Sequence, residues 1–140
     1  MYQQFLKDLK NAEPFELEAI KKIEKLNNVK LKMRCDNKDY DFMTDDDKTY
    51  EVKNDMMSSK TNNFFIEFIS FGKKSGIETT KADNHILIYN KINYYLIKTD
   101  DLKLLIFNNE VKFQKRSSND KTSIGYLVPV NLVVELSILI

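Results

Sequence analysis

Residues 40–53, which read YDFMTDDDKTYEVK, constrain the fold most strongly because they combine a polar turn with a two-faced strand. The turn lies at 45–48, and the residues after it alternate between apolar and charged side chains. Successive side chains of a strand point to opposite faces, so Glu51 and Lys53 share one face while their apolar neighbours share the other. The sequence therefore predicts a hairpin whose second strand is buried on one side only.

Asp41 lies on the first strand of this hairpin. If the turn is centred on its second and third aspartates, strand pairing places Asp41 across from Val52 and within one rung of Glu51 and Lys53. Two carboxylates beside a lysine form the outline of a site for a metal ion and a phosphate. The alternative is an exposed ion pair between Glu51 and Lys53, worth well under about 1 kcal/mol, with Asp41 only flanking the turn.

A helix is expected upstream, beginning at Pro14 and running to about Leu26. Glu16 falls near the middle of its apolar stripe, whereas Glu18 points away from it. Burial of a carboxylate is costly without a partner, so Glu16 either has a purpose near the hairpin or only favours the helix dipole. An earlier helix is expected over residues 2–11.

The remaining pattern predicts alternating strands and short helices. Strands are expected at 29–34, 39–43, 49–54, 64–71, 85–89, 93–99 and around 125–130. Loops are expected at 56–63 and 72–76, and short helices at 77–84 and from Asp100 or Asp101 to about Phe107. This order is typical of an α/β fold with a mixed sheet, here as a single domain over residues 1–140.

Composition excludes several classes of chemistry. The chain has 22 Lys and Arg against 21 Asp and Glu, which is not the strongly basic balance of many nucleic-acid-binding proteins. One cysteine and one histidine cannot form an internal disulfide or a structural zinc site of the usual type. His85 heads the apolar run HILIY and is expected to be a packed or hydrogen-bonded structural residue. Neither a signal peptide nor a membrane span is expected, which favours a cytoplasmic protein.

The arrangement of Asp41, then Glu51-Val52-Lys53 after a hairpin, with Glu16 on a preceding helix, resembles the PD-(D/E)XK nuclease superfamily. The later sequences FIEF and KKSGIETTKAD further resemble small phage- and virus-type members of that superfamily. The likeness covers roughly residues 13–89, although a tyrosine stands where a proline often precedes the first aspartate. It implies a restriction-endonuclease-like fold, with a central mixed β-sheet flanked by helices, and metal-dependent hydrolysis of DNA.

The resemblance also implies a role for each residue of the motif. Asp41 and Glu51 would hold Mg²⁺ or Mn²⁺, with the carbonyl of Val52 as a further ligand. Lys53 would orient the attacking water or stabilise developing negative charge. Glu16 would hold an outer metal-bound water or a second metal. The expected catalytic residues are therefore Glu16, Asp41, Glu51 and Lys53.

Supporting residues are expected on the segments that follow the hairpin. Glu67 lies on a strand next to the site and either faces it or is the buried partner of a lysine. Residues in or beside loops could contact phosphates or simply be solvated; they are Lys60, Lys73, Lys74, Ser75 and Lys81. Phosphate contacts bind without reading sequence and make binding depend strongly on salt.

Two other classes of function remain open. The chain could be a nuclease-fold module that binds nucleic acid or a protein partner without cutting. It could also be an oligomerisation protein, because the tail LVVELSILI is either a core strand or an interface in a homodimer. The favoured expectation is weakly specific or structure-directed cutting of DNA in phage or mobile-element DNA metabolism. Exonuclease, endonuclease and junction-resolving action are not separated by the sequence.

Overall fold

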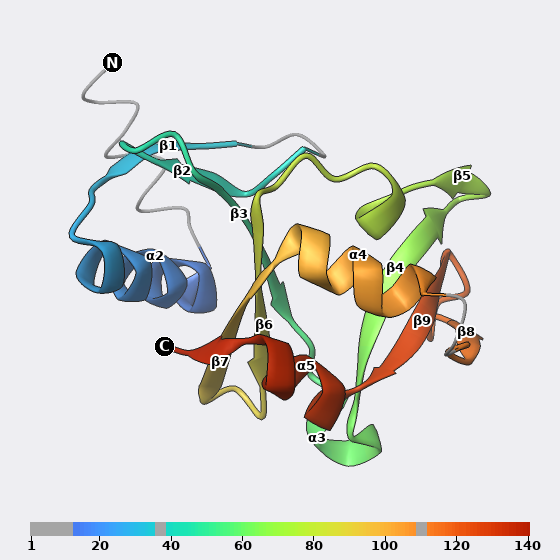
Figure 1. Ribbon diagram of the computed structural model, residues 1–140. Coiled ribbons are helices and arrows are strands. Elements are labelled where there is room, and N and C mark those ends of the chain that lie inside the picture. Colours follow the sequence, from blue (N-terminus) through green and yellow to red (C-terminus); the bar gives the residue numbers. More distant parts are fainter. Residues whose placement is uncertain (1–12, 36–38, 109–111) are drawn as a thin grey trace.

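The computed structural model describes residues 13–35, 39–108 and 112–140 (Figure 1). The helix expected over residues 2–11 lies outside these ranges. Helices are α2 (Pro14–Asn27), α3 (Ser58–Thr61), the 3₁₀ helix η1 (Gly76–Glu78), α4 (Thr99–Phe107) and α5 (Val130–Leu136). Strands are β1 (Leu31–Arg34), β2 (Phe42–Thr44), β3 (Thr49–Asn54), β4 (Asn63–Ser70), β5 (Lys73–Lys74), β6 (Asn84–Tyr89), β7 (Asn93–Lys98), β8 (Lys115–Ser117), β9 (Ser123–Pro129) and β10 (Ile138–Leu139).

The central sheet is mixed, which confirms the α/β architecture with flanking helices. Its strand order is β1-β2-β3-β6-β7-β10. The β3 and β6 strands pair in parallel, with Glu51 opposite His85, and the other neighbouring pairs are antiparallel. Parallel neighbours require a long crossover connection. Here that crossover contains α3, β4, β5 and η1.

The crossover takes β4 into a second sheet, where the sequence predicted a single one. This antiparallel sheet has the order β5-β4-β9-β8 within the described residues. Strand β4 pairs with β9, which is distant in the sequence, and the hydrophobic pattern of each segment does not predict such a long-range partner. Strands β3 and β4 therefore belong to different sheets (Figure 1).

The helix α2 covers one face of the central sheet. Its buried residues Ala19, Ile20 and Ile23 form a hydrophobic cluster with Tyr50 and Val52 of β3. Val52 therefore lies on the apolar face of β3, as the alternation predicted. Helix α2 begins at the expected proline and ends one residue past the expected end.

A second hydrophobic cluster lies on the other face. It joins Leu87 of β6 to Phe64 and Ile66 of β4, and to Leu102 of α4. Because side chains alternate along β6, its neighbours Ile86 and Ile88 belong to the first cluster instead. The same alternation turns Glu51 and Lys53 away from α2 and toward the side occupied by β4.

Several elements differ locally from the expectations. The expected loop at 72–76 contains β5, and the expected loop at 56–63 contains the single-turn helix α3. The helix expected over 77–84 is limited to η1, because the β-branched Thr79 and Thr80 follow and Thr80 hydrogen-bonds to the carbonyl of Asp39.

The C-terminal part also departs from expectation. Asp100 and Asp101 do not cap α4; they lie in its first turn, and Lys98 is the N-cap residue. The apolar tail is not a core strand but forms α5 and the edge strand β10, with Val133 buried and Ile138 exposed. In residues 13–35, 39–108 and 112–140, no helix has both the length and the apolar composition needed to cross a bilayer.

Gly76 is required by the close approach of η1 to β4. Its φ is +52°, and a Cβ there would overlap the carbonyl oxygen of Glu67, whereas Gly72 has φ +77° and open space around it. We expect Gly72→Ala to lower the free energy of unfolding by about 1 kcal/mol through backbone strain, and Gly76→Ala to lower it by roughly 2–4 kcal/mol. Urea denaturation measures both losses, and equal losses would contradict the close approach.

Candidate active site

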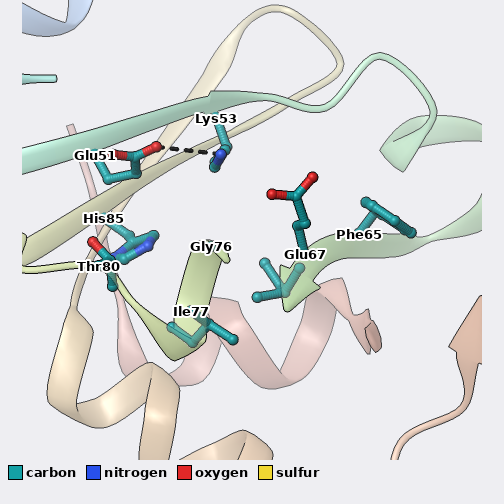
Figure 2. Close-up of a pocket in the computed structure, with 9 residues that line it drawn as sticks. Glu51, Lys53, Phe65, Glu67, Gly76, Ile77, Thr80 and His85 are labelled. Atoms are coloured by element: carbon teal, nitrogen blue, oxygen red, sulfur yellow. Dashed lines mark ion pairs between the residues drawn. The ribbon is translucent and has the colours of Figure 1, made fainter. Parts of the chain in front are cut away.

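Glu51 and Lys53 form an ion pair on the face of β3 that is turned away from α2. Glu51 Oε1 lies 3.2 Å from Lys53 Nζ, and the two side chains are 17% and 41% exposed respectively. Figure 2 shows this pair at the edge of a pocket between β3 and β4. The predicted shared face is confirmed, and the lysine keeps enough solvent access to exchange partners.

Asp41 joins this pair from the chain just before β2. Its Oδ2 atom accepts a hydrogen bond of 2.7 Å from the backbone N–H of Val52. The strands pair Phe42 with Tyr50, one residue away from the expected register, because the turn has three residues and Asp47 adopts a φ of +64°. Asp41 thus still reaches Val52, but through its side chain rather than as its partner in the ladder.

Asp41 is the carboxylate whose ionisation is most affected by the site. Burial and the negative charge of Glu51 raise the pKa of Asp41 from 3.8 to about 6. The charge of Glu16 raises this pKa further, while the Val52 N–H and Lys53 lower it. Glu16, Glu51 and Lys53, the other expected catalytic residues, therefore all act electrostatically on Asp41. A carboxylate whose pKa is raised by burial and by neighbouring carboxylates is typical of functional sites.

Glu16 is buried on the core-facing side of α2, with a relative exposure of 8%. Its Oε1 atom accepts a hydrogen bond of 2.9 Å from Nε of Arg34, at the end of β1. Glu18 is exposed, as expected. The ion pair with Arg34 compensates the burial of Glu16, which was not among the explanations weighed from the sequence. The sequence did contain a signal for this ion pair, because Glu16 on the apolar face of the helix is followed by the basic Arg34 on the next strand.

Glu67 faces the same pocket from the second sheet. The pocket is lined by Glu51, Lys53, Phe65, Ile66, Glu67, Gly76, Ile77, Thr80 and His85. In Figure 2 the Glu67 carboxylate points into the space between β4 and β3. Its Oε2 atom accepts a 3.0 Å hydrogen bond from Ser75 Oγ. The expected neighbourhood of Glu67 is thus present, and Ser75, expected to bind phosphate, is its partner.

His85 is a buried structural residue, as the sequence predicted. It is 3% exposed, and Nδ1 lies 2.8 Å from Oγ1 of Thr99. Burial and the nearby charges of Lys53 and Lys103 lower the pKa of His85 to about 3. The ring is therefore neutral near pH 7 and is poorly suited to carry a proton in catalysis.

The expected phosphate-binding lysines do not form one cluster. Lys73 and Lys74 are exposed on β5, whereas Lys60 is exposed in α3, at the opposite end of β4. Lys81 is exposed and lies 4.0 Å from Asp39. Lys73 and Lys74 are neighbours in sequence on one strand, and the fold leaves Lys60 apart from them.

Asp41 and Glu51 are the residues best placed to hold a metal ion. In residues 13–35, 39–108 and 112–140, no group of three or more His, Cys, Asp or Glu side chains is arranged to hold one. Mg²⁺ commonly uses one or two carboxylates and keeps several waters, so two oxygen-donating side chains with excess negative charge fit it. The expected carbonyl ligand, Val52, donates its N–H to Asp41, and its role as a ligand stays a prediction.

No protein family model, curated protein or solved structure matches this chain. The likeness of its Asp41 and Glu51-Val52-Lys53 pattern to nucleases therefore remains a prediction.

Asp41 should make stability depend on pH. Its folded-state pKa of about 6 lies above its ordinary value of 3.8, so its ionisation lowers stability as the pH rises from 4 to 6. We expect Asp41→Asn, which can still accept the Val52 hydrogen bond, to raise the free energy of unfolding at pH 7 by roughly 1–2 kcal/mol. At pH 3.5 the gain should vanish. Urea denaturation in EDTA tests this, with the exposed Asp45→Asn as the control; a gain independent of pH would contradict it.

Proposed function

We propose that this protein hydrolyses phosphodiester bonds in DNA with the help of Mg²⁺ or Mn²⁺. The supporting observation is the group formed by Asp41, Glu51 and Lys53, in which burial and then repulsion from the Glu51 carboxylate raise the pKa of Asp41. This arrangement costs stability in the free protein, and a bound cation would relieve the repulsion. Such stored electrostatic cost is characteristic of sites that bind a charged ligand.

Asp41 and Glu51 would hold the metal ion in this proposal. When bound, the ion would acidify a coordinated water and neutralise charge on the phosphate. Asp41 comes from the residue before β2 and Glu51 from the adjacent strand β3, and the Val52 N–H fixes the orientation of Asp41. The backbone therefore positions one ligand before any ion binds, which reduces the entropy lost on binding.

Lys53 would contact the phosphate. Its ammonium group is paired with Glu51 at 3.2 Å, yet its side chain is 41% exposed. Exchanging such a partly exposed partner for a phosphate oxygen costs little. A lysine ammonium placed beside the reacting phosphate stabilises charge that develops in the transition state.

Glu16 and Glu67 would act from the two sides of the site. Glu16 is held by Arg34 behind Asp41, and Glu67 is held by Ser75 on the opposite wall. Glu67 lines the pocket beside Glu51 and Lys53 and would orient a water there, whereas Glu16 lies on the α2 side of β3 and would act through Asp41. We assign Glu16 the role of holding an outer water or a second ion, and Glu67 a supporting role.

The DNA-binding surface would be weakly specific. Lys73 and Lys74 are exposed beside the Glu67–Ser75 wall, and lysine contacts to phosphates carry no base information. Cutting would therefore respond to DNA structure more than to sequence. The choice of DNA over RNA and a context in phage or mobile-element DNA metabolism are supported by the motif resemblance alone.

The second candidate is a nuclease-fold module that binds nucleic acid or a protein partner without cutting. The observation that favours it is that two carboxylates of the site are already paired with cations of the protein, Glu16 with Arg34 and Glu51 with Lys53. Exposed apolar residues of the tail, Leu136, Ile138 and Leu139, would then serve partner binding or a homodimer. Metal binding and cleavage separate this candidate from the nuclease.

Divalent metal should stabilise the protein through Asp41 and Glu51. We expect saturating Mg²⁺ or Mn²⁺ to raise the melting temperature, by an amount equivalent to about 2.7 kcal/mol when the ion is at 100 times its dissociation constant. Asp41→Asn and Glu51→Gln should each abolish the shift, while Asp47→Asn, in an exposed turn, should retain it. Differential scanning calorimetry provides the measurement. An unchanged shift in both site variants would rule out these ligands.

Cleavage should depend on the Glu51–Lys53 pair and not on ion pairs in general. Lys32 of β1 and Asp47 of the turn between β2 and β3 form an exposed ion pair of 2.7 Å, which makes Lys32→Ala a matched control. We expect Glu51→Ala and Lys53→Ala to lower the cleavage rate by at least about 10²-fold, and Lys32→Ala to leave it nearly unchanged. Plasmid, linear and branched DNA should be tested with each metal.

The role assigned to Glu16 is tested by comparing Glu16→Gln with Glu18→Gln. Glu16→Gln keeps the shape and an acceptor for Arg34, so it should reduce cleavage far more than Glu18→Gln on the exposed side of α2. Cleavage that is equal in all these variants, or absent from the wild type on every substrate and metal, would overturn the proposed function.

A further inference from the structure

The turn between β4 and β5 contains a phenylalanine in an unfavourable backbone conformation. Ser70 pairs with Lys73, which leaves Phe71 and Gly72 as the two turn residues. Their φ angles are +49° and +77°. Two-residue hairpin turns of this kind favour asparagine, aspartate or glycine at the first position. A phenylalanine there costs about 1–2 kcal/mol relative to an ordinary backbone conformation.

The side chain of Phe71 gains no burial that would offset this cost. It is 79% exposed, the highest value among the exposed large hydrophobic residues in the described part of the chain. Single exposed apolar residues are common on protein surfaces. Phe71 differs because exposure and backbone strain coincide on one residue at the tip of a hairpin. Strain that is maintained without a packing benefit points to a functional role.

The tip is held in place by the neighbouring hairpin. The backbone N–H of Phe71 donates a 2.7 Å hydrogen bond to the carbonyl of Thr122, in the turn between β8 and β9. The preceding residue, Ser70, pairs with Ser123 of β9. Phe71 is therefore presented on two connected hairpins rather than on a loose loop. Such preorganisation lowers the entropy cost of binding.

The charges around the tip are mainly positive. Lys73 and Lys74 follow it directly and are exposed, and the exposed Lys121 adjoins the residue that binds the Phe71 N–H. Asp120 in the same neighbouring turn accepts hydrogen bonds from Ser118 and Thr122, which lower its pKa. An exposed aromatic ring among lysines is the combination that binds single-stranded nucleic acid, with the ring stacking on a base and the lysines contacting phosphates.

The tip is connected to the candidate active site through β4. Phe71 follows Glu67 by four residues, and Ser75 returns from the tip to hydrogen-bond with Glu67. At about 3.3 Å per residue, the tip lies roughly 13 Å along the strand from Glu67. A single strand that leaves the site along β4 would reach the ring within a few nucleotides.

We propose that Phe71 stacks on an unpaired base of single-stranded DNA while Lys73 and Lys74 bind the flanking phosphates. The identity of the ligand as DNA rests on the proposed function. A single ring with three lysines is too small and too charged for the apolar centre of a stable protein interface. The nuclease would thereby favour substrates with single-stranded ends or gaps over intact duplex.

Substitution by asparagine tests the proposal because it should relieve the strain and remove the ring. We expect Phe71→Asn to be at least as stable as the wild type in urea, since asparagine tolerates a positive φ. Its dissociation constant for a fluorescein-labelled 20-nucleotide single strand, measured by anisotropy in EDTA, should rise about 5- to 100-fold. Phe71→Trp should retain binding. Binding to a blunt duplex should change little in either variant.

Ile92 provides a matched control at a different hairpin. It is 71% exposed in the turn between β6 and β7, so Ile92→Asn removes a comparable apolar side chain. The stacking proposal would be overturned if Phe71→Asn bound the single strand as tightly as the wild type does, or if Ile92→Asn weakened binding equally. It would also be overturned if the wild type did not bind the single strand at all. The binding measurements are made in EDTA and repeated on Lys53→Ala, so that they report on stacking independently of catalysis. A wild type that binds through Phe71 but never cuts would contradict the proposed function alone.

Discussion

The parallel pairing of β3 with β6 is the constraint on which the rest of the structure depends. Parallel neighbours cannot be joined by a tight turn, so the chain must leave the central sheet and return. This protein uses the excursion to build β4 and pair it with β9 in a second sheet. The charged face of β3 consequently meets Glu67 across a pocket instead of facing open solvent. The candidate site is a product of this crossover.

The buried carboxylates of the site are tolerated in two different ways. Glu16 is neutralised by Arg34, which makes its burial compatible with an ordinary folded core. Asp41 receives one backbone hydrogen bond, but burial and the charges of Glu51 and Glu16 raise its pKa to about 6. The ion pair with Arg34 fixes the position of Glu16. The arrangement around Asp41 leaves an electrostatic cost that a bound ion would relieve, which is why Asp41 is central to the proposed function.

The β4–β5 hairpin connects the Glu67–Ser75 wall of the pocket to the molecular surface. Gly76 allows η1 to lie against the backbone of Glu67, and this approach holds Ser75 within hydrogen-bond distance of the Glu67 carboxylate. At the other end of the hairpin, Phe71 is strained, exposed and fixed by Thr122. The hairpin thus combines rigid support near the pocket with an aromatic tip outside it. Both features are consistent with one strand of nucleic acid passing along β4.

The sequence by itself determined the features that depend on local periodicity: the helix from Pro14, the bounds and two faces of β3, and the burial of Glu16. It also predicted His85 as structural. Only the tertiary structure decided that β4 lies in a second sheet, that Arg34 pairs with Glu16, and that the hairpin register places Asp41 one residue away from expectation. Alternation and helix spacing are set by neighbouring residues, whereas sheet membership and ion-pair partners depend on contacts between distant segments.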